Sequence, residues 1–325
     1  MELLALLADG QFHSGVDLAQ QLNVSRTTIS KRVADWQALG LDIDTVTGKG
    51  YRLQTPIDWL NQSKIYAFLP DNIQNLISDF SIHSIITSTN DFVAQSLQKK
   101  SQSGVVCLAE MQSAGRGRRG RTWLSPAAGT FYGSVGWVFN EGFQVVEGLS
   151  LAIGVAVIRA LMDCGVEGLQ LKWPNDIVWQ GKKLGGILIE MNAEVGGNCQ
   201  VVVGVGVNLA LPQTVKTQID QEVIDLREIN PNINRQQITA TIVSHLLLVL
   251  SDYAVQGFKA YRQTWQNYDA LLGIPVKVLG LAQNIEGIGA GIDEQGAFLI
   301  KTSTGIEAIS GGEVSIRTDA TLSPI

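Results

Sequence analysis

A chain of 325 residues is longer than one hydrophobic core usually supports, so we expect two or three domains. The formal net charge is −6, and a dense cluster of arginines in such a chain is not explained by general affinity for DNA. The three cysteines, Cys107, Cys164 and Cys199, are far apart, which argues against a disulfide framework or a zinc site and favours a cytoplasmic protein with reduced thiols. We expect neither a signal peptide nor a membrane span.

Residues 1–60 predict a winged helix-turn-helix domain. Apolar residues at helical spacing predict a short first helix, a second helix after Ser14, and a third from about residue 26 to 39 that turns Ile29, Val33 and Trp36 inward. Residues 41–53 alternate and contain a Thr-Gly-Lys-Gly turn, which predicts a hairpin. This is the order of elements in a winged helix.

The outer face of the third helix carries the donors and cations that a DNA-recognition helix needs. The candidate DNA-binding residues are Ser25, Arg26, Thr27, Thr28, Lys31 and Arg32, with Lys49 in the wing. Residues 1–60 nevertheless hold five Lys and Arg against seven Asp and Glu, so a single copy should bind DNA weakly and a dimer better. Winged helices also serve as protein-contact domains, and this alternative stays open.

After a hinge at Gln54-Thr55-Pro56, residues 65–270 predict a mixed α/β domain. Strands are expected at 82–87, 105–111, 130–139, 185–191 and 200–211, and helices at 90–99, 149–164 and 238–253. Residues 271–325 change character: short strands at 275–279, 285–292, 297–302, 305–309 and 313–316, separated by glycines, predict a small β-barrel. The predicted fold class is therefore α+β.

The segment from Gly115 to Arg121 contains three glycines and four arginines in seven residues. Glycines let a backbone approach a ligand closely, and guanidinium groups hold phosphate or carboxylate with two hydrogen bonds, so we interpret the segment as an anion clamp. The alternative is a solvated surface loop. Its G-x-G-x-x-G spacing does not indicate a dinucleotide-binding turn, because a loop and then a strand follow instead of a helix.

Two further clusters border predicted strands. The first is Lys172-Trp-Pro-Asn175-Asp176, and the second is Lys182-Lys183-Leu-Gly185-Gly186. Together with the arginines they suggest a phosphate-bearing ligand and a metal ion, with Asp176 as the Mg²⁺ ligand and Lys183 neutralising phosphate or carboxylate. Ser88-Thr89-Asn90 could hydrogen-bond a neutral polar ring or could simply cap a helix.

Residues 115–123 (GRGRRGRTW), 172–176 (KWPND) and 183–190 (KLGGILIE) resemble the signatures of biotin–protein ligases. The winged helix and the C-terminal barrel extend the resemblance to the bifunctional members, which also repress biotin-synthesis genes. The resemblance implies a central domain of the class II synthetase type and an SH3-like C-terminal barrel. It also implies biotin, ATP and Mg²⁺ as ligands, a biotin carboxyl carrier protein and operator DNA as partners, and a homodimer when biotinyl-5′-AMP is bound.

The resemblance also implies roles for the individual residues. The expected ring-binding residues are Ser88, Thr89, Asn90 and Gln112. The expected catalytic residues are Arg116, Arg118, Asp176 and Lys183, and the remaining ligand-binding residues are Gly115, Gly117, Arg119, Arg121, Trp123, Lys172, Asn175, Gly185, Gly186 and Asn208. One departure concerns residues 211–230, which contain no Trp to stack on adenine and leave Val223 or Ile224 to cover the base.

Three alternatives remain open at this point. The chain could be a lipoate-type protein ligase, a biotin-sensing repressor without catalysis, or a ligase whose winged helix does not bind DNA.

Overall fold

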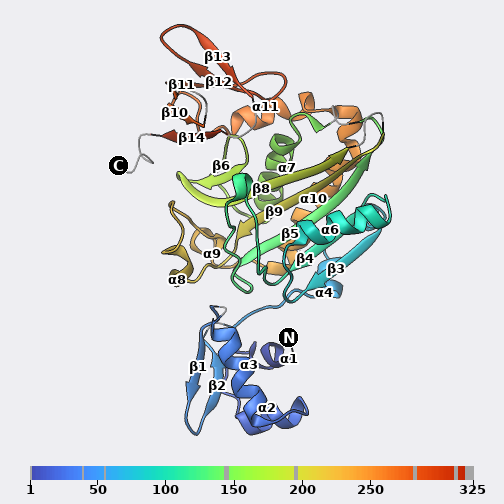
Figure 1. The fold of residues 1–325 in the computed structure, drawn as a ribbon, viewed down its shortest axis with the longest axis vertical. Helices are drawn as coiled ribbons and strands as arrows, with labels where there is room; N and C mark the ends of the chain where they lie inside the picture. The colour runs from blue at the N-terminus through green and yellow to red at the C-terminus, as the bar shows by residue number, and fades with distance from the viewer. Residues whose placement is uncertain are drawn as a thin grey trace.

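The computed structural model describes residues 2–38, 40–54, 56–142, 146–193, 197–280, 284–310 and 314–318. An N-terminal helical unit, a central α/β unit and a C-terminal sheet follow one another along the long axis of the molecule (Figure 1). Several predicted boundaries fall on Leu39, Thr55, Glu313 and residues 319–325, which lie outside the described residues.

The N-terminal unit is the predicted winged helix. It contains α1 (Glu2–Leu7), α2 (Gly15–Gln21) and α3 (Arg26–Ala38), followed by the antiparallel wing strands β1 (Ile43–Val46) and β2 (Gly50–Leu53). Ile29 and Val33 of α3 are buried against the leucines of α1, as their helical spacing predicts. Met111 and Ala127 of the central unit belong to the same apolar cluster, so the winged helix packs directly against the central unit.

The central unit is built on a seven-stranded sheet in the order β3-β4-β5-β9-β8-β7-β6. Only β3 (Asp79–His83) and β4 (Val105–Ala109) pair in parallel; the other strands, β5 (Thr130–Phe139), β6 (Leu169–Lys172), β7 (Asp176–Trp179), β8 (Lys182–Ala193) and β9 (Cys199–Asn208), pair antiparallel. The valines of β9 are all buried because helices cover both faces of the sheet.

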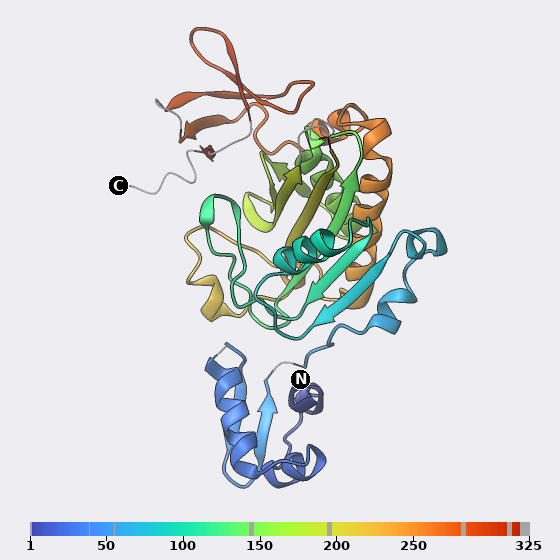
Figure 2. The same ribbon diagram turned by 45° about the vertical axis from the view of Figure 1, so that its right-hand side comes forward.

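Helix α6 (Thr89–Lys99) lies on one face of this sheet, and α7 (Leu149–Asp163) and α10 (Arg235–Gln256) lie on the other (Figures 1 and 2). Four short helices and one 3₁₀ turn complete the unit: α4 (Gln62–Tyr66), α5 (Asp71–Gln74), α8 (Gln213–Lys216), α9 (Leu226–Ile229) and η1 (Arg118–Gly120). Within the described residues, α10 is the one helix long and apolar enough to cross a membrane, and 61% of that apolar stretch is buried inside the protein.

Helix α11 (Lys259–Asn267) leads into the C-terminal sheet, which contains the five predicted strands. They are β10 (Pro275–Leu279), β11 (Ile285–Ile292), β12 (Phe298–Lys301), β13 (Ile306–Ile309) and β14 (Ser315–Thr318), all antiparallel in the order β13-β12-β11-β10-β14. Trp173 connects the central unit with this sheet. Its indole Nε1 donates to Gly296 O at 3.0 Å, and its ring contacts the ring of Phe298.

The predicted fold class is confirmed, with differences in detail, and the short helices α4, α5, α8 and α9 were not predicted. The first strand of the sheet is Asp79–His83 rather than 82–87, so it ends several residues before α6 begins. The strands β6 and β7 and the helix α11 were not among the predicted elements.

Candidate active site

A cavity of about 590 Å³ opens between the glycine–arginine loop (residues 113–126), the strands β7 to β9 and the C-terminal sheet. It brings together almost all of the ligand-binding residues that the sequence predicts: Ser88, Thr89, Asn90, Gln112, Arg116, Gly117, Arg118, Arg119, Arg121, Trp123, Lys172, Asn175, Asp176, Lys183, Gly186 and Asn208. Segments that are far apart in the sequence therefore converge on one cavity.

The two predicted residues that do not line the cavity, Gly115 and Gly185, permit close packing behind it. A Cβ on Gly115 would lie 2.6 Å from Trp123 O, and a Cβ on Gly185 would lie 2.7 Å from Gly206 O. Both distances are far below van der Waals contact, so only glycine fits at either position. Gly115 lets the two arms of the loop approach each other, and Gly185 lets β8 lie close to β9.

Trp123 packs against two glycines of the sheet, Gly186 and Gly206. A Cβ on Gly206 would come within 2.7 Å of the indole ring, and one on Gly186 within 3.2 Å. The indole Nε1 is buried and has no hydrogen-bond partner within the described part of the chain.

The glycine–arginine loop folds back on itself. Gly117 N donates to Arg121 O at 2.8 Å, and Trp123 N donates to Gly115 O at 2.9 Å. Between them Arg119 adopts a left-handed conformation, with φ of 61°. Arg118 Nη1 donates to Asn175 Oδ1 at 3.1 Å, and burial lowers the pKa of the Arg118 guanidinium although Asp176 opposes the effect.

On strand β8, Lys183 Nζ lies 2.7 Å from Asp176 Oδ1 and 5.4 Å from the centre of the Trp123 ring. Both side chains of the ion pair are largely buried, at 16% and 23% exposed. Burial also lowers the pKa of the neighbouring Lys172. A cation held in so enclosed a place interacts strongly with any anion that enters, because water screens it poorly.

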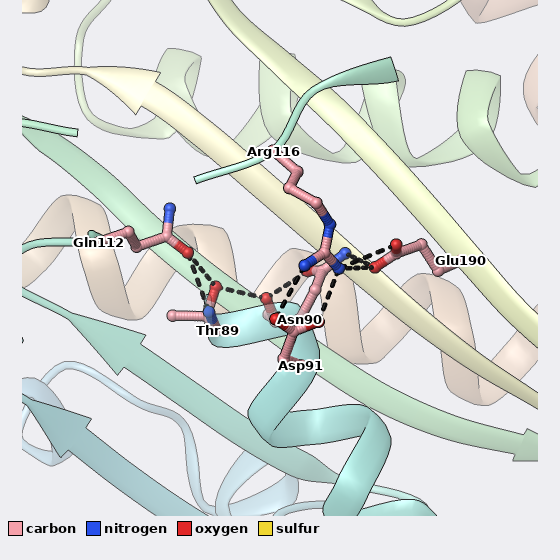
Figure 3. Close-up of polar contacts among 7 residues, drawn as sticks. Thr89, Asn90, Asp91, Gln112, Arg116 and Glu190 are labelled. Atoms are coloured by element: carbon pink, nitrogen blue, oxygen red, sulfur yellow. Dashed lines mark hydrogen bonds and ion pairs between the residues drawn. The ribbon is translucent and has the colours of Figure 1, made fainter. Parts of the chain in front are cut away.

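A chain of hydrogen bonds forms the other end of the cavity (Figure 3). Thr89 donates twice to Gln112 Oε1, from N at 2.9 Å and from Oγ1 at 3.1 Å. The buried Ser134 hydroxyl lies 2.7 Å from Thr89 Oγ1 and 2.6 Å from Asn90 Oδ1, and Asn90 Nδ2 donates to Glu190 Oε2 at 2.7 Å. Ser88, also buried, immediately precedes this chain. The result is a polar but uncharged surface around Thr89 and Gln112.

The two ends of the cavity therefore differ in charge. Among the described lining residues, seven side chains are cationic and two are carboxylates. The cations are Arg116, Arg118, Arg119, Arg121, Lys172, Lys183 and Arg317, and the carboxylates are Asp176 and Asp220. Such a cavity suits an elongated ligand with a neutral polar head and a phosphate-rich tail.

Several residues at the site were missed from the sequence. Ser134 lies within an apolar strand, and Asp91, Asp220 and Arg317 carried no signal that pointed to the cavity. Glu190 is the last residue of the segment 183–190, so its presence in that motif could have suggested a role.

The predicted DNA-binding residues lie at the start of α3 and in the wing. Ser25, Arg26, Thr27, Lys31 and Lys49 are exposed, and Thr28 and Arg32 are partly exposed. Ser25 Oγ accepts a hydrogen bond from Thr28 N at 3.1 Å and so holds the first turn of the helix. Lys49 lies over the ring of Phe12, 5.6 Å from its centre.

The fold and the cavity define a ligase with an N-terminal helix-turn-helix domain, and comparison with known proteins identifies the ligase. Residues 82–208 match the biotin/lipoate A/B protein ligase family, residues 1–52 an HTH domain, and residues 271–317 the biotin protein ligase C-terminal domain. The bifunctional ligase/repressor BirA of Escherichia coli is 36% identical over 98% of this chain and 97% of its own length, and that of Bacillus subtilis is 28% identical over 95% of both chains. A solved biotin protein ligase from Aquifex aeolicus, in complex with biotin and ATP, superposes with a TM-score of 0.63 at 29% identity, covering 75% of this chain and 100% of that chain.

This chain belongs to the family of bifunctional biotin–protein ligase/repressors.

Proposed function

We propose that this protein activates biotin with ATP to form biotinyl-5′-AMP and pyrophosphate, and then transfers biotin to a lysine of a biotin carboxyl carrier protein. The observation that carries the proposal is that one cavity joins an uncharged polar surface at Thr89 and Gln112 to six cations besides the paired Arg116. Biotin has a neutral ureido ring at one end and a carboxylate at the other, and ATP supplies the phosphates.

Charge determines the first step. The biotin carboxylate must attack the α-phosphorus of ATP, and two anions repel each other strongly where water is excluded. Lys183 and Arg118 both line the cavity and reduce this repulsion by binding the carboxylate and the α-phosphate. As the new acyl–phosphate bond forms, pyrophosphate leaves toward Arg119 and Arg121.

The residues around Asp176 are suited to bind Mg²⁺ together with the phosphates of ATP. Among the described residues no group of three His, Cys, Asp or Glu side chains could hold a metal by itself, but Mg²⁺ in nucleotide enzymes typically binds one or two carboxylates together with substrate phosphates. Asp176 would be such a ligand, with Asp220 also on the cavity wall and Asn175 beside the phosphates. When bound, the ion neutralises phosphate charge that would otherwise oppose the attack.

The second step needs protection of the intermediate. Biotinyl-5′-AMP is a mixed anhydride that water hydrolyses, so the glycine–arginine loop closes over it through Arg116, Gly117 and Arg118. Trp123 and Asn208 flank the adenylate, and Val223, which also lines the cavity, covers the base; Ile224 is buried in the core instead. The carrier lysine amine then attacks the acyl carbon, the C–O bond to phosphate breaks, and AMP leaves.

We also propose that the winged helix represses transcription of biotin-synthesis genes. The exposed residues Arg26, Thr27 and Lys31 support contacts to DNA, and a homodimer that forms with bound biotinyl-5′-AMP would present two copies of α3 to a two-fold operator. A cytoplasmic location places the protein with both its carrier and its operator.

Exchange of labelled pyrophosphate into ATP tests the ligase chemistry. We expect exchange with biotin and MgATP, none without biotin, and transfer of biotin to a purified carrier domain. Exchange with lipoate alone would instead support the lipoate-type ligase, and no exchange with either acid, in folded protein, would support a sensor without catalysis.

A further inference from the structure

Two protein carboxylates occupy the guanidinium of Arg116 in the glycine–arginine loop. Its Nη1 donates to Asp91 Oδ2 at 2.8 Å, and its Nη2 lies 2.7 Å from Asp91 Oδ1 and 3.0 and 3.1 Å from the two oxygens of Glu190 (Figure 3). The hydrogen bond with Asp91, and next that with Glu190, raises the pKa of Arg116 further above its ordinary value. Two carboxylates thus neutralise this cation, so it is poorly suited to hold a phosphate.

Glu190 also contacts a residue of the polar surface of the cavity, Asn90. Its Oε2 accepts from Asn90 Nδ2 at 2.7 Å, and Asn90 Oδ1 lies 2.6 Å from Ser134 Oγ. Both polar atoms of the Asn90 amide are therefore engaged within the protein. Because Gly204 packs against Asn90, with an added Cβ only 2.2 Å from Oδ1, the amide has little freedom to turn toward a ligand.

These contacts connect the two ends of the glycine–arginine loop. From Arg116 they run through Glu190 and Asn90 to Ser134 and Thr89, and Thr89 binds Gln112 at the start of the loop. Gln112 Nε2 then donates to Ser125 Oγ at 3.3 Å, and Ser125 Oγ donates to Trp123 O at 2.9 Å at the end of the loop. One continuous chain of polar contacts thus passes beneath the loop and along the surface proposed for the biotin ring.

We propose that Glu190, supported by Asp91, is a positioning residue for the ligase reaction: by holding Arg116 and Asn90 together, it makes closure of the loop and binding of the biotin ring depend on each other. The proposal rests on the proposed function for the identity of the ligand, but not for the position of the loop. Hydrogen-bond chains of this kind couple their members, so that removing one residue weakens the others.

The position of the cluster makes the proposal testable. Arg116 and Glu190 are 38% and 40% exposed, and ion pairs so exposed contribute little to folding stability. Glu190→Gln keeps an oxygen that can accept from Asn90 and should therefore fold with an unchanged melting temperature, which separates positioning from a general loss of structure. Glu190→Ala leaves the buried Asn90 amide without this acceptor and should melt at a lower temperature. Glu286→Gln is a matched control, because Glu286 is also a strand carboxylate with a cation at 2.7 Å, but it lies in the C-terminal sheet.

The first measurement needs no ligand. Trypsin cleaves after arginine, and the loop contains four of them, so the rate of loop cleavage reports how often the loop opens. We expect faster cleavage in Glu190→Ala than in the native protein and Glu286→Gln, with Glu190→Gln between them because an amide oxygen still accepts one hydrogen bond. Equal cleavage rates in all four proteins would overturn the proposal even if no ligase activity were found.

The second measurement uses pyrophosphate exchange and the release of biotinyl-5′-AMP in the absence of carrier. For Glu190→Gln we expect KM for biotin and the release rate each to rise about tenfold, with kcat for exchange within about threefold, because the reacting groups lie at the other end of the cavity. Asp91→Asn should have a smaller effect, and Glu190→Asp should restore part of the affinity.

A double variant decides whether Glu190 acts through Arg116. If it does, Arg116→Ala combined with Glu190→Ala should be no worse than the more severe single variant. The proposal would be contradicted if the fold-changes of the two single variants multiplied in the double variant. It would also be contradicted if KM for biotin and the release rate in Glu190→Ala stayed within twofold of the native values. Absence of biotin-dependent exchange in the native protein would instead count against the proposed function, while the cleavage rates would still decide the position of the loop.

Discussion

The glycine–arginine loop and helix α3 both present cations toward a proposed phosphate-bearing partner, but they place those cations in very different surroundings. The cavity collects seven cationic side chains against two carboxylates within about 590 Å³. The winged helix spreads five cations over residues 1–60 among seven acidic residues, and Arg52 is already paired with Asp44 at 2.5 Å.

The difference shows how surroundings determine the strength of a charge. In the enclosed cavity each cation acts at short range with little screening, so a single arginine or lysine can change a reaction rate. On the open face of α3, salt weakens each contact, and useful affinity for DNA requires several contacts in two copies. Substitutions in the cavity should therefore have much larger effects than substitutions on α3.

The largest effect is expected from Lys183→Gln. It removes the largely buried ammonium group that faces the proposed carboxylate and α-phosphate, and loss of one such contact typically lowers kcat by about 10² to 10³, or about 3–4 kcal/mol. Biotin-dependent pyrophosphate exchange measures the loss. The adjacent, exposed Lys182→Gln is the control, and an equal loss there would show that general charge, not position, is responsible.

A smaller effect is expected from Gly206→Ala, which changes shape and not charge. The new Cβ would lie 2.7 Å from the Trp123 ring, and overpacking of this kind costs about 1–3 kcal/mol, or roughly 10- to 100-fold in substrate affinity if the ring moves into the cavity. Titration calorimetry with biotin and with ATP measures the affinity.

Trp123→Phe in the Gly206→Ala background provides the control for that experiment. The shorter ring removes the indole atoms that meet the added Cβ, so affinity should partly recover. If the double variant binds as weakly as Gly206→Ala, the contact with Trp123 is not the cause.

Much of this arrangement follows from local sequence. The valines of β9 and the apolar run of α7 predict buried elements by composition, and the arginines and glycines of residues 115–121 predict an anion-binding loop. Short strands are harder to predict: β6 and β7 are only four residues each, too short for a clear alternation. The strand β3 lies at the edge of the sheet, where its partly exposed residues give a weak hydrophobic pattern.

The polar chain beneath the loop could not be predicted in the same way. Glu190 lies 100 residues from Asn90 and 74 from Arg116, and only the pairing of β8 with β9 over α6 brings them together. Likewise, nothing local indicates that Gly115 and Gly185 serve packing and do not line the cavity. Contacts of long sequence separation depend on the whole fold, which propensity and spacing do not encode.

The smallest effect is expected from Arg26→Ala or Lys31→Ala on α3. Each exposed cation that contacts a phosphate should contribute about one unit to the slope of log affinity against log salt, so its loss should weaken DNA binding several-fold and reduce that slope by about 1 per copy. Binding of operator DNA at several salt concentrations, with biotin and MgATP, measures both quantities. Lys99→Ala on α6 is the control, because Lys99 is also exposed but belongs to the central unit. Ligation should be unchanged in all three variants, since neither α3 nor Lys99 lines the cavity. An unchanged salt slope together with weaker dimerisation would mean that the winged helix contacts protein and not DNA, and the comparison between the two cationic regions would then hold only for the cavity.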